Sequence, residues 1–197
     1  GFPAMVCFHW PDEDGLVTDF NVRHYEAVAA GGQGLIVSES LHVSEEGRMY
    51  PKQLGIWSDR HISGLHRITE AVHRRGGLIL AQIHHGGLWS DSARILGPTA
   101  GMPTKTGRPN LEITTDEIKN IQEKFTEAAK RAVKAGFDGI ELHGCHSYLL
   151  CDFMNKTVNH RTDRYGEPTL FTTEIIDMIR TSLPGPLTMG IRLGGYE

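Results

Sequence analysis

The stretch that decides the fold is "GIELHGCHSY" (Gly139–Tyr148), in which a short apolar run ends in two histidines and a tyrosine. A short apolar run bounded by glycine is typical of a strand that is buried on both faces, as in a parallel sheet. Histidine is costly to bury without a partner. Its place at the end of such a strand therefore indicates a site at one edge of the sheet.

The same pattern recurs along the chain. A strand-like run, "GFPAMVCF", opens it, and three more short apolar runs lie at Gly34–Ser40, Leu78–His84 and Leu187–Leu193. Helical patterns alternate with them at Asp19–Ala30, Ser58–Arg75, Thr114–Gly136 and from about Pro168. The long irregular stretch His85–Leu111 is rich in glycine and proline and is expected to form an ordered excursion above the sheet. Five strands alternating with helices predict a parallel sheet with the helices outside it.

The clearest helical pattern begins at Thr114, which can form a capping box with Glu117. Gly136 stands where the helix is expected to end. Between them, apolar residues recur on one face: Ile118, Ile121, Phe125, Ala128, Ala132 and Val133. The sequence therefore predicts an amphipathic helix that packs on the sheet through this face.

Five strands that alternate with helices fit either a doubly wound sheet or part of a (β/α)8 barrel. A dinucleotide-binding fold carries G-x-G-x-x-G after its first strand, but the residues after Val6 read "CFHWPDEDG". Polar residues gather instead at the carboxyl ends of the strands, at Ser38–Ser40, Gln82–His85, His143–Tyr148 and Arg192. This is the barrel arrangement, in which strand ends and the following loops build the active site. We therefore predict an α/β protein, a (β/α)8 TIM barrel present only in part, with about five βα units and the last strands missing.

The ends of the chain bear on its domain organisation. Gly1 already lies inside a strand-like run, and Glu197 follows directly after another. Natural termini usually lie outside such elements. We therefore expect residues 1–197 to be a single partial barrel domain, truncated at both ends and excised from a longer protein.

The composition excludes several classes of protein. With 197 residues, 39% of them hydrophobic, the chain can bury a core within one domain. A net charge of −4 without a basic stripe argues against a nucleic-acid partner. No apolar run approaches about 18 residues, which argues against a membrane span. The few cysteines, without zinc-finger spacing, indicate a reducing, cytoplasmic setting: Cys7, Cys145 and Cys151.

Three interpretations of His143 and His146 remain open on the residues alone. A zinc ion would need a third ligand, such as Glu141 or His85, but the sequence has no H-E-x-x-H pattern and we predict no metal. The two imidazoles can also be hydrogen-bonded core residues. In the third interpretation, a turn at Gly144–Cys145 brings His146 back beside His143, and their N–H groups grip one carbonyl oxygen and stabilise negative charge there. The Tyr148 hydroxyl then delivers a proton to carbon. Such enolate chemistry needs a hydride source, and hence a cofactor.

A further choice concerns His84 and His85, which are adjacent in the third strand-like run. Neighbouring side chains on a strand point to opposite faces of the sheet. We therefore expect at most one of the two to reach the site, and the sequence leaves open which.

The segment "HGCHSYLLCDFMNKTVNHRTDRYG" (His143–Gly166) resembles the H-x-x-[HN]-x-Y-L…F…N-x-R-x-D-x-Y-G signature of the old yellow enzyme family of flavin-dependent ene-reductases. Shorter matches fall in the family's order: "PAMVCF", "GLIVSES", "GRMYPKQLGIWSDRHI" and "AQIHHGG". The resemblance runs from the family's first barrel strand to its fifth. It implies an FMN-bearing (β/α)8 barrel that takes hydride from NADH or NADPH. The hydride passes from flavin N5 to the β-carbon of an α,β-unsaturated carbonyl compound.

The resemblance also implies which residues contact the flavin. The segment that lies along the ring is matched by Pro3, Ala4, Met5 and Val6. Ser40 matches a position whose backbone approaches the ring, and Gln82 matches the amide that binds its pyrimidine edge. Arg192 matches the cation beside the N1–C2 carbonyl side, where it would stabilise the reduced, anionic ring.

On the substrate side, the resemblance implies a carbonyl clamp made by His143 and His146, with Tyr148 as the proton donor. Phe8 matches a position in the wall of the substrate site. The substrate implied is a small-molecule enone.

Several positions depart from the family pattern. Val6 replaces a threonine or cysteine that touches the flavin, Cys7 is one residue off that position, and Leu88 stands where arginine is frequent. "FMNKTVN" and "YGE" replace F-L-S-P and Y-G-G. These departures favour a divergent branch of the family.

The family's phosphate-binding loops follow the seventh and eighth strands, which lie beyond this chain. We therefore expect residues 1–197 alone to bind FMN weakly, to reduce no enone and to cover their open sheet edges by association with another copy. The alternative interpretation is a non-catalytic half-barrel that self-associates and holds no flavin.

Overall fold

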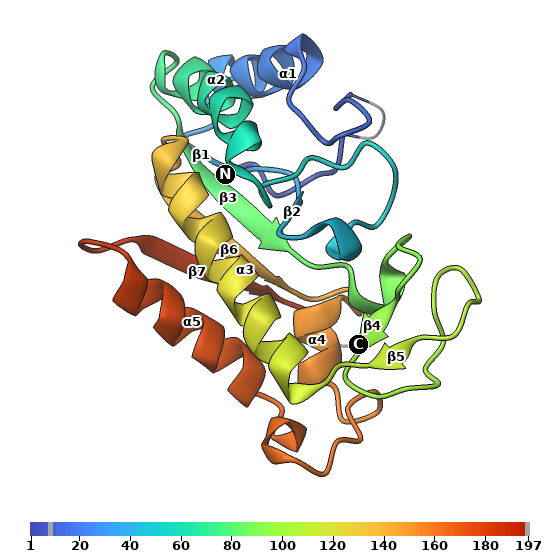
Figure 1. Ribbon diagram of the computed structural model, residues 1–197. Helices are drawn as coiled ribbons and strands as arrows, with labels where there is room; N and C mark the ends of the chain where they lie inside the picture. The colour runs from blue at the N-terminus through green and yellow to red at the C-terminus, as the bar shows by residue number, and fades with distance from the viewer. Residues whose placement is uncertain (8–9, 196–197) are drawn as a thin grey trace.

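The computed structural model describes residues 1–7 and 10–195 (Figure 1). Its main sheet is parallel, in the order β1-β3-β6-β7, with β2 also paired to β3. The strands are β1 (Leu35–Val37), β2 (Leu41–His42), β3 (Leu78–His84), β6 (Gly139–Gly144) and β7 (Thr188–Leu193). A small second sheet pairs β4 (Leu96–Gly97) with β5 (Leu111–Glu112) within the excursion after β3. The order and direction of the strands are those expected for the first part of a barrel.

The helices cover the outer face of the sheet. The longer ones are α1 (Asp19–Ala30), α2 (Ile62–His73), α3 (Thr115–Lys134) and α5 (Leu170–Ser182), and a short α4 (Leu149–Met154) follows β6. Single 3-10 turns lie at Glu45–Gly47, Asp59–His61, Gly87–Trp89 and Arg164–Gly166. Figure 1 shows α3 and α5 side by side, with α1 and α2 paired at the other end of the sheet. No helix in the described part of the chain is long and apolar enough to cross a membrane.

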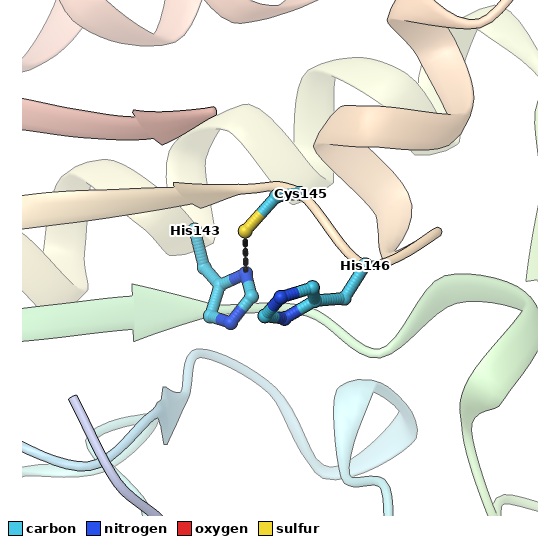
Figure 2. Close-up of side chains that lie close together, drawn as sticks. All are labelled: His143, Cys145 and His146. Atoms are coloured by element: carbon cyan, nitrogen blue, oxygen red, sulfur yellow. Dashed lines mark hydrogen bonds between the residues drawn. The ribbon is translucent and has the colours of Figure 1, made fainter. Parts of the chain in front are cut away.

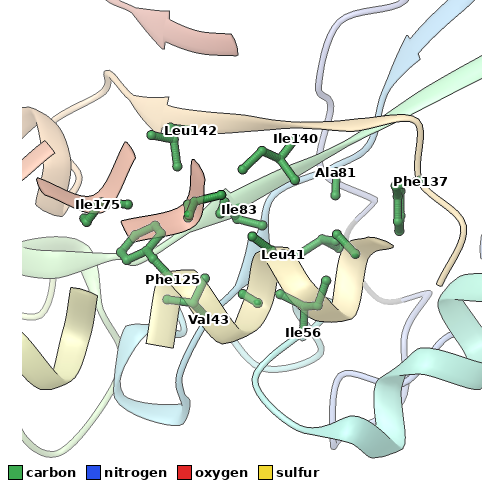
Figure 3. Packing of buried hydrophobic residues seen from close by; sticks show 14 of the residues in the cluster. Leu41, Val43, Ile56, Ala81, Ile83, Phe125, Phe137, Ile140, Leu142 and Ile175 are labelled. Atoms are coloured by element: carbon green, nitrogen blue, oxygen red, sulfur yellow. The ribbon is translucent and has the colours of Figure 1, made fainter. Parts of the chain in front are cut away.

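The hydrophobic core lies between the sheet and α3. Side chains alternate along a strand, so Ile83 on β3 and Leu142 on β6 both point toward Phe125 on α3, and all three are fully buried (Figure 3). The capping box predicted at Thr114 is present, since its hydroxyl accepts from the backbone N–H of Glu117. The core thus fixes which face of each strand is left for a site.

Among the differences from the sequence-based prediction, two have a clear physical reason. The first predicted strand is not a regular strand, since among the described residues it makes only one bridge, from Phe2 to Ile36. Pro3, next to that bridge, has no N–H to donate to a ladder. The second concerns Val133, which is 42% exposed. It lies one residue, or about 100° around the helix, beyond Ala132, and so turns out of the apolar face.

Candidate active site

The inner face of the sheet, opposite α3, collects the polar side chains of β3 and β6. The ladder sets Gln82 beside Glu141, and the Gln82 Nε2 atom donates to the Glu141 Oε1 atom over 2.7 Å. In the same register His84 comes next to His143, and His143 pairs with Arg192 of β7. Sequence-distant polar residues are therefore brought to one face because the strands are parallel and in register.

A turn after β6 folds the chain back on itself. His146 and Ser147 adopt left-handed backbone conformations, with φ values of 63° and 53°. We expected the turn to lie at Gly144–Cys145, and it lies two residues later. The result matches the expectation that His146 returns beside His143: the ring centroids are 5.3 Å apart, and both rings lie on the same side of the chain (Figure 2).

Tyr148 completes this cluster. It occupies the N-cap position of α4, and its ring centroid is 4.8 Å from that of His143 and 6.0 Å from that of His146. His143 is buried, whereas His146 is exposed and Tyr148 is partly exposed. The structure thus brings together His143, His146 and Tyr148, three of the four side chains assigned to the substrate from the sequence, with one imidazole accessible from outside.

The ring of His84 also belongs to this cluster, which settles the choice between His84 and His85 that the sequence left open. The His84 ring centroid is 4.5 Å from that of Tyr148 and 5.2 Å from that of His143. Its side chain is fully buried, and neither ring nitrogen has a hydrogen-bond partner among the described residues. Burial holds the pKa of His84 well below its usual value, so the ring is neutral.

His85 points away from the cluster, as expected for its neighbour on the strand. Its Nδ1 atom accepts from the backbone N–H of Gly87 over 3.1 Å, and burial lowers its pKa to about 4. Only one of the two adjacent histidines therefore reaches the site, and it is His84. The signal in the sequence was the spacing of two from Gln82, which places both side chains on one face.

Three of the residues assigned to the flavin, Pro3, Ala4 and Arg192, line a hollow of about 440 Å³ together with Glu141. The Gln82 amide lies next to this hollow through its hydrogen bond to Glu141. The Arg192 Nη1 atom donates to the Ala4 carbonyl oxygen at 3.5 Å. Met5 leaves 58% of its surface exposed. An apolar wall beside an amide and a guanidinium fits a flat, apolar ring with a polar edge. The residues present therefore fit the ring part of a flavin.

Ser40 accepts two hydrogen bonds from Gln53, a residue that was not singled out from the sequence. The Gln53 Nε2 atom donates to both the carbonyl oxygen (3.0 Å) and the hydroxyl (3.2 Å) of Ser40. Gln53 is fully buried. Val6 is partly exposed in the segment before Cys7, and Phe8 lies outside the described residues.

Glu39 is a second residue that the sequence analysis did not single out. Its carboxylate is fully buried and accepts from the backbone N–H of Cys7 at 3.1 Å and from the Asn21 amide at 3.4 Å. Burial raises the pKa of Glu39 to about 7. The carboxylate fastens the first segment, which carries the flavin-side residues, to the end of β1. The signal in the sequence was that Glu39 is the one acidic residue in "GLIVSES" (Gly34–Ser40).

Glu39 is expected to make stability depend on pH. Its pKa of about 7 exceeds the ordinary value of 4.5, so between these values the folded state binds more protons than the unfolded state. The free energy of unfolding should therefore fall as the pH rises through this window, on the order of 3 kcal/mol. The variant Glu39→Gln should lose this slope, and the exposed-residue control Glu123→Gln should keep it. Thermal unfolding of the full-length proteins from about pH 4 to about pH 8 measures the effect; identical slopes for wild type and Glu39→Gln contradict it.

A metal-ligand set also lies at this site. Donor atoms of His143, Cys145 and His146 all fall within 4.8 Å of one another. The sequence offers Glu141 or His85 as a third ligand, whereas in the structure Cys145 is the residue whose donor atom lies near both imidazoles. The turn at His146–Ser147 makes this juxtaposition, which residue spacing alone does not reveal.

Comparison with known proteins agrees with this geometry. Residues 2–195 match the model of the NADH:flavin oxidoreductase / NADH oxidase family. An NADPH dehydrogenase of Bacillus subtilis is 36% identical over 98% of the chain, and one of Halalkalibacterium halodurans is 39% identical over 98%. An old yellow enzyme homologue from Zymomonas mobilis, of known structure, superimposes with a TM-score of 0.88 at 29% identity over 98% of the chain.

The chain spans 58%, 59% and 58% of the lengths of these three relatives. The solved structure from Zymomonas mobilis is a TIM barrel, and the parallel sheet described above is the corresponding part of one. Members of the family use FMN, with NADH or NADPH as the reductant. The match covers nearly the whole chain and includes the strands that carry the histidine cluster. The chain therefore belongs to the NADH:flavin oxidoreductase family, the family of the old yellow enzymes.

Proposed function

We propose that the full-length protein is an FMN-dependent oxidoreductase that reduces the activated C=C bond of an α,β-unsaturated carbonyl compound. The observation that carries the proposal is the convergence of His143, His146 and Tyr148 on the inner face of the sheet. Two relatives are named NADPH dehydrogenase, which supports NADPH over NADH as the reductant. The substrate is a small enone.

The residues of this chain supply the ring-binding half of a flavin site. Gln82 and Arg192 offer an amide and a cation to the polar edge of the ring, and the segment Pro3–Val6 offers an apolar wall. The Gln82 amide is oriented by its hydrogen bond to Glu141, which uses one N–H of that amide. When bound there, FMN supplies a hydride to the β-carbon of the substrate.

The remaining steps belong to the side chains of the cluster. The His143 and His146 imidazoles donate N–H groups to the substrate carbonyl oxygen and stabilise the negative charge that grows on it. The Tyr148 hydroxyl gives its proton to the α-carbon. His84, fully buried against Tyr148 and His143, excludes water from one side of these groups and holds the tyrosine ring in place.

Two half-reactions test the proposed function. Under anaerobic conditions, NADPH should bleach the flavin absorbance of the full-length protein, and 2-cyclohexenone should restore it with formation of the saturated ketone. A protein whose flavin is reduced by NADPH but reoxidised by oxygen alone, and by no enone, would refute the assignment.

The open edge of the sheet favours a second candidate for residues 1–197 in isolation, a self-associating half-barrel. β7 is the last strand in the order, and in the described part of the chain it pairs with β6 only. The unpaired backbone N–H and C=O groups along such an edge can form hydrogen bonds with a strand of another chain. The exposed side chain of Leu193, 59% accessible, lies at its end.

For the isolated chain we expect weak FMN binding and association into a homo-oligomer. Loss of the phosphate-binding loops and of the far barrel wall removes several kcal/mol of binding, and each 1.4 kcal/mol is about tenfold in affinity. Equilibrium dialysis with FMN and sedimentation velocity measure the two properties. A monomer that retains FMN through gel filtration would contradict this expectation.

A further inference from the structure

The turn after β6 sets three metal-ligating groups around one point. Donor atoms of His143, Cys145 and His146 lie within 4.8 Å of one another, and Figure 2 shows the thiol beside the edge of the His143 ring, joined by a dashed line to a ring nitrogen. The Cys145 Sγ atom is 3.9 Å from the His143 Nδ1 atom. In a tetrahedral zinc site, with Zn–N near 2.0 Å and Zn–S near 2.3 Å, these two atoms would stand about 3.5 Å apart. The pair is therefore already close to the spacing that one ion imposes.

A second observation at the same place points to a ligand. His84 is fully buried with its ring edge-on to that of His143, and neither of its nitrogens is paired among the described residues. Buried polar atoms normally have a partner, so an unpaired imidazole marks a place where a bound group completes the hydrogen bonding or coordination. His146 is exposed, which gives an ion a path into the cluster.

We propose that His143, Cys145 and His146 bind a thiophilic divalent cation, with Zn²⁺ as the best fit, in place of the carbonyl substrate. Two imidazoles and a thiolate are soft donors that suit zinc and not magnesium or calcium. Binding converts the Cys145 thiol to a thiolate, its proton passes to solvent, and the imidazoles coordinate as neutral groups. Three protein ligands leave the fourth position of the tetrahedron to water or to His84.

The cation is thus an inhibitor of the site, and this inhibition rests on the proposed function. An ion held between the two imidazoles occupies the position assigned to the carbonyl oxygen. Zn²⁺ is expected to raise KM for the enone and leave kcat unchanged. The binding itself does not depend on any enone being reduced.

The test measures Zn²⁺ binding to the full-length protein by competition with a chromophoric chelator, without NADPH or enone. The wild type should bind one ion, and Cys145→Ser should bind it more than about 100-fold more weakly, beyond the 10–100-fold loss typical of an outer-shell partner. His146→Asn, at an exposed position with a left-handed backbone that asparagine tolerates, should show a similar loss. Cys151→Ser, which alters another buried free cysteine, is the matched control and should bind as wild type does.

Circular dichroism and FMN content confirm that each variant is folded. With Co²⁺ in place of Zn²⁺, a thiolate-to-metal charge-transfer band should appear in wild type and Cys151→Ser and be missing from Cys145→Ser. Wild-type affinity in Cys145→Ser or His146→Asn, or no binding by the wild type, would overturn the proposal. Zinc binding in a protein that reduces no enone would refute the proposed function and leave the metal site standing.

Discussion

Replacing His143 with alanine in the full-length protein is expected to lower kcat/KM for an enone by about 30- to 1000-fold, which is a loss of about 2–4 kcal/mol of transition-state stabilisation. His143 is only 6% exposed, so its N–H group acts in a setting from which water is largely excluded. A hydrogen bond to developing charge is worth more there than in water. His146→Ala should have a similar effect, because the charge is shared between two donors.

Steady-state kinetics with 2-cyclohexenone measures these losses. The exposed His160, which lies outside the cluster, supplies the matched control, and His160→Ala should behave as wild type. Enone reduction that survives both replacements unchanged would rule out the carbonyl clamp.

Tyr148→Phe is expected to slow reoxidation of the flavin by an enone by about 10²- to 10⁴-fold, the contribution of a positioned proton donor. Phenylalanine keeps the ring that packs against His84 at 4.5 Å and His143 at 4.8 Å, so the variant removes only the hydroxyl. Reduction of the flavin by NADPH uses no proton from this residue and should be nearly unchanged.

Stopped-flow absorbance, with the two half-reactions measured separately, distinguishes these effects. Tyr165→Phe serves as the control, since its hydroxyl bonds Glu174 away from the cluster. A Tyr148→Phe variant slowed only in the reductive half would show that the tyrosine has another role.

The elements best predicted from the sequence are those whose own residues determine them. β3 and β6 were predicted from end to end, because each is a short, largely apolar run bounded by glycine or by a polar site residue. α1 was also predicted with its observed bounds. The first strand failed because its pairing depends on neighbours and on a missing N–H at Pro3, which apolar content does not report.

The candidate site was predicted in part. Strand alternation and spacing placed His143, His146 and Tyr148 together, and the structure shows their rings in contact. The position of the turn was missed, because non-glycine residues adopt a positive φ in only a few per cent of cases, and Gly144 was the more obvious candidate. The nearness of Cys145 to His143 follows from that turn and was missed with it.

Two buried groups were missed for another reason. From strand alternation alone, choosing His84 over His85 requires knowing which strand face meets α3; the spacing of two from Gln82 decides it only once Gln82 is assigned to the site. Glu39 lies between Ser38 and Ser40, after the apolar part of its run, and its hydrogen bond to the backbone of Cys7 joins segments that are 32 residues apart. Such contacts exist only in the folded chain.

The most direct test of the carbonyl clamp is a crystal structure of the full-length protein with FMN and a bound enone or unreactive enone analogue. We predict that the ligand's carbonyl oxygen lies about 2.7–3.1 Å from a ring nitrogen of both His143 and His146, with the Tyr148 hydroxyl over the α-carbon. A ligand whose carbonyl oxygen is bound by other groups, with the two imidazoles turned away from it, would contradict the account.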